Sequence, residues 1–104
     1  MNTESESSTW KEIHYTDYFR YRMQFRRIPD GVPEQIFLHA TERYFDTETQ
    51  RSIAVHPVRL GRRRRAQMML AYEEYVDYVE FVTIHKINRR EINFRIRTGR
   101  WIPK

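Results

Sequence analysis

The chain has 104 residues, of which 19 are lysine or arginine and 14 are aspartate or glutamate, so its formal net charge at pH 7 is +5. This length fits one domain that buries roughly 65% of its unfolded surface. The absence of cysteine excludes a disulfide scaffold and a cysteine-ligated zinc site. The 2 Trp, 7 Tyr and 6 Phe are too many for a disordered chain, and no apolar run is long enough to cross a membrane as a helix. We therefore expect a small basic domain of the cytoplasm.

The kind of basic residue is informative, because lysine occurs only at Lys11, Lys86 and Lys104 and all other basic residues are arginine. Arginine is favoured where a planar group must bind phosphate or carboxylate. A GC-rich genome is the alternative explanation. The arginines are also clustered, which predicts a polyanionic partner or an acidic protein partner. The clusters are Arg20, Arg22, Arg26 and Arg27; Arg62 to Arg65; and Arg89, Arg90, Arg95, Arg97 and Arg100.

The N-terminal half predicts helices. Residues 1–9 are polar and predict a disordered tail, followed by one domain over residues 10–104. Thr16 is a candidate N-cap for a helix over residues 17–27, which Pro29 and Gly31 follow. Pro33 suits the first turn of a second helix over residues 33–45, and a polar loop follows at 46–50.

The middle of the chain predicts strands. Apolar and β-branched residues favour strands over residues 53–58, 66–73 and 78–87, with a short hairpin loop at 74–77. Pro57 cannot donate to a neighbouring strand, so the first of these strands is expected to lie at an edge or to end there. The short connections predict an antiparallel meander of three or four strands.

The last element, residues 89–98, has two interpretations. Asn88, Glu91 and Gly99 supply the start and stop signals of a helix, whereas the alternation of Ile92, Phe94 and Ile96 also suits a strand. The signals at both ends favour a short C-terminal helix. The predicted fold class is thus α+β, with two N-terminal helices, an antiparallel meander and a short C-terminal helix.

The chain offers few classical catalytic sites. Phosphate-loop and dinucleotide motifs are absent, the four histidines lack metal-ligand spacing, and we expect no metal and no cofactor. His39 and Glu42 lie one predicted helical turn apart and are a possible metal-binding pair, but a partly buried histidine with a local partner is the favoured interpretation. Arg22, Arg26, Arg43 and Trp10 are interpreted as packing or surface residues.

Metal-free RNA cleavage is the chemistry that these residues support best. It needs a base, an acid and cations around the phosphorus, and histidine and arginine can supply them. In the predicted meander, His85 lies near Arg64, Arg65 and the start of the last helix. The alternative is that His85 only caps a sheet edge. We predict that nucleic acid contacts Arg62, Arg63, Arg64, Arg97 and Tyr72.

The order of elements resembles that of small RelE/ParE-like toxins and neighbouring families of short uncharacterised domains. The likeness covers residues 15–101. It rests on the segments RSIAVH (51–56), GRRRR (61–65), MLAY (69–72), VTIH (82–85) and RIRTGRW (95–101).

This resemblance implies a metal-independent ribonuclease toxin, for which ribosome-associated RNA is a candidate target and a small antitoxin-type protein is the partner. It transfers catalytic roles to His85, Arg65, Arg95 and Arg100. The alternatives are a non-enzymatic nucleic-acid-binding module and a protein-interaction domain.

Overall fold

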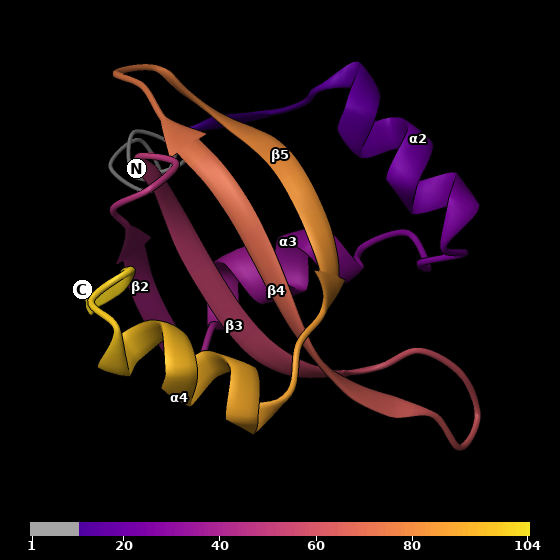
Figure 1. Ribbon diagram of the computed structural model, residues 1–104. Helices are drawn as coiled ribbons and strands as arrows, with labels where there is room; N and C mark the ends of the chain where they lie inside the picture. Colours follow the sequence, from indigo (N-terminus) through magenta and orange to yellow (C-terminus); the bar gives the residue numbers. More distant parts are fainter. Residues whose placement is uncertain (1–10) are drawn as a thin grey trace, which may run out of the picture.

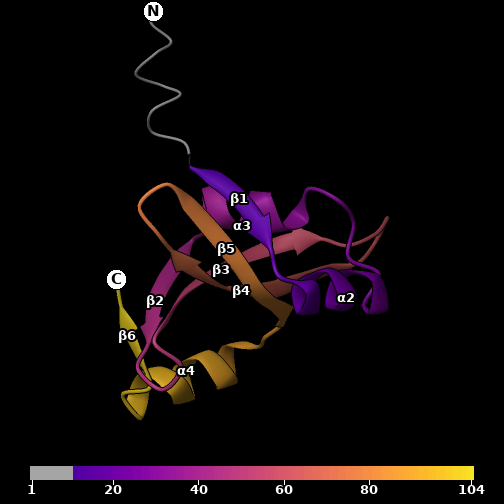
Figure 2. The same cartoon turned by 90° about the horizontal axis from the view of Figure 1, so that it is seen from above.

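A six-stranded mixed sheet and three helices make up the computed structural model, which describes residues 11–104 (Figures 1 and 2). The α+β class is confirmed, and the meander of three or four strands is corrected to a larger sheet. The predicted tail at residues 1–9 and Trp10 lie outside the described residues. The elements are β1 (Glu12–Tyr15), α2 (Asp17–Phe25), α3 (Val32–His39), β2 (Glu42–Asp46), β3 (Arg51–Arg59), β4 (Arg65–Glu74), β5 (Tyr78–Lys86), α4 (Arg89–Arg97) and β6 (Trp101–Pro103).

Capping side chains fix two helix starts at the predicted places. The Thr16 hydroxyl accepts a hydrogen bond from the Phe19 backbone N–H at 3.0 Å, and the Asn88 side chain accepts one from Glu91 at 2.8 Å. Each bond satisfies a first-turn donor that the helix itself leaves without a partner. Residues 89–97 are therefore helical, and Gly99 follows the helix with a φ of 81°.

The antiparallel order β3, β4, β5 is confirmed, and its strands are central in a longer sheet with the order β1-β5-β4-β3-β2-β6. β1 adds parallel to β5, whereas β2 and β6 add antiparallel on the other side. β3 is not an edge strand, because β2 pairs with it as far as Val55. Pro57 lies beyond that ladder and faces Gln67 only, so its missing N–H leaves no neighbour unsatisfied.

The second predicted helix is too long. The chain leaves helical geometry at Ala40, with ψ at 132°, and residues 42–46 form β2 in place of helix and loop. Pairing with β3 and β6 outweighs the local helical spacing there, and Tyr44 gains a stacked contact with Trp101 at 5.3 Å between ring centroids.

The sheet separates two apolar clusters. Figures 1 and 2 show α3 and α4 on opposite sides of the sheet. One cluster lies under α2 and α3 and includes Phe19, Ile36 and Phe81. The other lies under α4 and includes Ile92 and Trp101. Within residues 11–104, no helix is long and apolar enough to cross a membrane.

Candidate nucleic-acid interface

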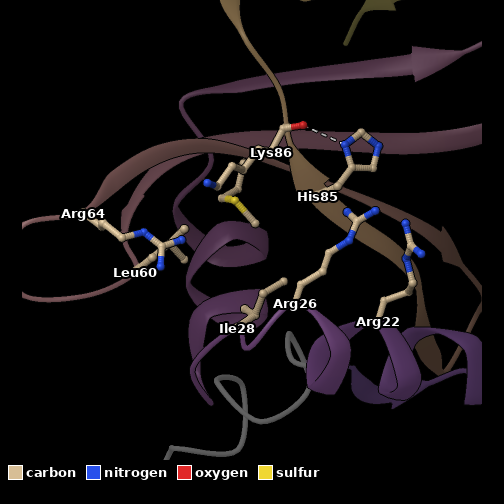
Figure 3. A pocket seen from close by; sticks show the side chains of 8 residues that line it. Arg22, Arg26, Ile28, Leu60, Arg64, His85 and Lys86 are labelled. Carbon is tan, nitrogen blue, oxygen red and sulfur yellow. Dashed lines mark hydrogen bonds between the residues drawn. The ribbon is translucent and has the colours of Figure 1, made fainter.

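A cavity of about 640 Å³ opens where α2, the β3–β4 hairpin and the end of β5 meet (Figure 3). Its cationic side chains come from three separate segments of the chain, while its floor is apolar. We call it the cationic cavity. Its lining residues are Arg22, Arg26, Ile28, Leu60, Arg64, Met68, His85 and Lys86.

Two of these side chains are held by the outer edge of β5. β1 pairs with β5 only from Tyr78 to Phe81, so beyond that point no strand within residues 11–104 lies on the side of β5 away from β4. The Arg26 guanidinium donates to the Ile84 carbonyl at 3.1 Å, and His85 Nδ1 lies 2.8 Å from the Lys86 carbonyl oxygen. These bonds satisfy edge acceptors and hold both side chains at the cavity.

The bond to a carbonyl also fixes the tautomer of His85. A carbonyl oxygen only accepts, so Nδ1 must carry the proton in that bond. In the neutral ring, Nε2 is then left with a free lone pair. His85 is thus arranged as a proton acceptor beside several cations.

Arg22 comes from the middle of α2 and lacks a full set of partners. Its guanidinium carbon lies 5.4 Å from the centroid of the Tyr18 ring. Its Nε is buried, and no hydrogen-bond partner reaches it among residues 11–104. A buried donor without a partner costs about 1–3 kcal/mol, so the placement of Arg22 at the cavity lowers the stability of the fold.

The arginine run lies in the β3–β4 hairpin, which extends beyond the sheet in Figure 1. The Leu60 N–H donates to the Arg64 carbonyl at 2.8 Å, which closes the hairpin and directs Arg64 to the cavity. Arg65 faces Arg59 directly across the two strands. Like charges at that position repel, and a bound polyanion would relieve the repulsion. Arg62 and Arg63 are exposed in the loop.

The cavity is electropositive because its lining, within residues 11–104, consists of basic and apolar side chains and contains no carboxylate. Among residues 11–104, none of its four arginine and lysine side chains has an ion-pair partner within 4.0 Å. Unpaired cations around a concave surface concentrate the field and attract anions. The arrangement therefore suits phosphate.

The structure does not bring Arg95 and Arg100 to His85. Arg95 pairs with Glu91 at 3.3 Å, and its guanidinium carbon lies 5.0 Å from the Trp101 ring centroid on the α4 side of the sheet. Arg100 pairs with the buried carboxylate of Asp46 at 3.2 Å and with Glu48 at 3.3 Å. Both arginines stabilise the region around α4 and β6.

The Asp46 carboxylate is held in that region by several hydrogen bonds. Burial raises the pKa of its carboxyl, but hydrogen bonds from Arg100, the Thr49 N–H, Trp101 and the Glu48 N–H outweigh burial, so the pKa lies below its ordinary value. The carboxylate is thus held ionised as a structural acceptor.

The other predicted contacts are also separate from the cavity. Arg97 lies on α4, with its guanidinium carbon 5.7 Å from the Phe94 ring centroid. Tyr72 is only 2% exposed and packs edge-on against Phe37, so no face of its ring is open to a base. His39 and Glu42 do not share a helix, since Glu42 lies on β2 and pairs with Arg89. Within residues 11–104 no group of three or more potential metal ligands occurs.

Arg22 and Arg26 were not predicted as functional residues. The only local signal is their spacing, because residues four apart share one row of a helix. That row borders Phe19 and Met23, which face the core, and the sequence does not say that β5 lies beside it.

No protein-family model, curated protein or solved structure matches this chain.

Proposed function

We propose that the protein binds RNA and holds backbone phosphate in the cationic cavity. Four cations carry the proposal: Arg22, Arg26, Arg64 and Lys86 converge from three segments on one cavity, to which the described part of the chain contributes no carboxylate. Guanidinium groups bind phosphate oxygens through paired N–H donors, and the exposed arginines of the hairpin loop extend the positive surface beyond the cavity.

Salt dependence tests this proposal. The affinity for a short RNA, followed by fluorescence anisotropy, should fall steeply as salt rises, because bound cations on the RNA are released. Replacing both Arg26 and Arg64 by Gln should weaken binding and lower the slope of log Kd against log salt by about 1.4, since each phosphate contact contributes about 0.7 for a single strand.

The matched control removes two charges elsewhere. The double variant Arg90→Gln/Lys104→Gln has the same net charge as the cavity variant but leaves the cavity intact. If the two double variants weaken binding equally, net charge and not the cavity explains the affinity, and the proposal is wrong.

The tautomer of His85 favours a second candidate function, a toxin-type, metal-independent ribonuclease. In that reaction Nε2 takes the proton of an RNA 2′-hydroxyl, and the 2′-oxygen attacks phosphorus. The bond from phosphorus to the 5′-oxygen breaks, and that oxygen takes a proton from Lys86 or water. The arginines stabilise the extra negative charge on phosphorus.

His85→Asn separates the two candidates. The asparagine amide can still donate to the Lys86 carbonyl, but it offers no base in place of Nε2. A ribonuclease would cleave RNA in EDTA and lose cleavage in this variant while RNA affinity stays. If RNA remains intact with the unaltered protein, the ribonuclease candidate is wrong and RNA binding is the remaining proposed function. Growth arrest on expression, relieved by a small co-expressed partner, would support the toxin role and the antitoxin-type partner.

A further inference from the structure

The outer side of α2 carries an unusual group of exposed aromatic rings. Tyr18 is 52% exposed, Tyr21 57% and Phe25 67%. The Tyr21 and Phe25 rings stack with centroids 5.8 Å apart and planes inclined by 16°. We call these three residues the aromatic face. The core of the domain does not use it, because Phe19 and Met23 supply the buried side of the same helix.

The aromatic face adjoins the cationic cavity. An α-helix turns by about 100° per residue. Viewed down the axis of α2, Arg22 and Arg26 therefore lie on one side of Tyr18. Phe25 and Tyr21 lie on its other side, within about 60° of it. The contact between Arg22 and the Tyr18 ring joins the two surfaces. A chain held by its phosphates in the cavity thus has flat aromatic rings directly beside it.

We propose that the aromatic face stacks unpaired bases, so that the preferred ligand is single-stranded RNA. This inference rests on the proposed function and specifies its substrate class. Single-stranded nucleic acid is bound where a positive groove follows the backbone and aromatic rings stack the bases. The bases of a duplex already stack on one another inside the helix, so a duplex would use the cavity but not the rings.

The position of the aromatic face beside the cationic cavity favours this ligand over an acidic protein. The face consists of aromatic rings with arginine beside them, and α2 exposes no aliphatic side chain. Aromatic rings and arginine are also enriched at protein interfaces. The cationic cavity directly beside the rings adds a site for phosphate, which RNA carries next to every base and an unmodified acidic protein lacks.

The test compares three ligands of about 12 nucleotides, a length within the range of single-strand binding sites. They are oligo-uridylate, an RNA duplex, and an abasic chain that keeps the phosphates without the bases. We expect Tyr21→Ala/Phe25→Ala to weaken oligo-uridylate binding by about tenfold to a hundredfold, because stacking on one ring accounts for about 5- to 150-fold per base. Affinity for the duplex and the abasic chain should not change, nor should the salt slope.

Phe94→Ala is the matched control. Phe94 is 54% exposed and lies beside Arg97 on α4, so it has the same chemistry away from the cavity. This variant should bind all three ligands like the unaltered protein.

An unchanged affinity of Tyr21→Ala/Phe25→Ala for oligo-uridylate, or an equal loss for all three ligands, would overturn the inference. The first result, together with capture of a small acidic protein that requires Tyr21 and Phe25, would assign the face to a protein partner. In either case the Arg26→Gln/Arg64→Gln variant still tests the proposed function by itself. An unaltered protein that binds none of the ligands would refute both the inference and the proposed function.

Discussion

The buried carboxylate of Asp46 allows a sharp prediction about what Arg100 does. Asp46 is 3% exposed and accepts from Trp101 Nε1 at 3.1 Å, from the backbone N–H groups of Glu48 and Thr49, and from Arg100. If Arg100 is a structural partner of Asp46, then removing the carboxylate should destabilise the fold far more than removing the guanidinium.

The magnitude follows from which groups lose a partner. Asp46→Ala leaves the Trp101 Nε1 donor buried and unsatisfied, at about 1–3 kcal/mol. The two backbone donors lie near solvent and lose about 0.5 kcal/mol each. The Arg100 side chain is about one-third exposed, so its ion pair adds less than about 1 kcal/mol. We expect a loss near 3 kcal/mol for Asp46→Ala and below 1 kcal/mol for Arg100→Ala.

Urea denaturation followed by circular dichroism measures both free energies of unfolding. The double variant should be no less stable than Asp46→Ala, because the interaction is already absent. A loss for the double variant that equals the sum of the two single losses, or a loss below about 1 kcal/mol for Asp46→Ala, would refute the assignment of Arg100 to this network.

Three further variants test other parts of the account. Asp46→Asn should make stability less dependent on pH in acid. The pKa of Asp46 is lowered in the fold, so its contribution to stability is present above the unfolded pKa of about 3.9 and is lost as pH falls through the lower folded pKa. Thermal melts over this pH range would detect the difference. Asn88→Ala should cost about 1 kcal/mol by removing the cap of α4, and an unchanged urea midpoint would contradict that role. Arg65→Glu should stabilise the hairpin by about 0.5 kcal/mol, because it turns the repulsion with Arg59 into attraction. The affinity for RNA should fall in the same variant. A loss of stability would show that the cross-strand repulsion is not significant.

Short-range interactions explain which elements the sequence predicts well. The Thr16 and Asn88 caps bond within three residues, and Gly99 adopts a local backbone conformation. None of these three features requires knowledge of the rest of the fold to be predicted. The three long strands are predictable for the same reason, since their residue types favour extended structure and the loop at 75–77 is short.

Short strands are different, because distant partners create them. β1 pairs with β5, far along the chain, and β6 has only three residues beside β2. Residues 42–46 carry helical spacing and become a strand only through β3 and β6. Local propensity is a weak guide where pairing of this kind decides the conformation.

The candidate site divides in the same way. The meander placed His85 near Arg64, and both line the cavity. The sequence clusters Arg95 and Arg100 with other arginines, but Glu91 and Asp46 engage them on the α4 side. Arg26 is held at the cavity by its hydrogen bond to the Ile84 carbonyl on β5. These two residues are 58 apart in sequence, so no local sequence pattern predicts the contact.

The most direct test of the cationic cavity observes the arginine side chains themselves. Nitrogen-15 NMR spectra resolve the Nε–H group of each arginine during titration with a short oligo-uridylate. We predict saturable shifts for Arg22, Arg26 and Arg64, which line the cavity, while the signals of Arg95 and Arg100 stay in place. Shifts confined to Arg95 and Arg100, or equal shifts at all five arginines, would contradict this prediction.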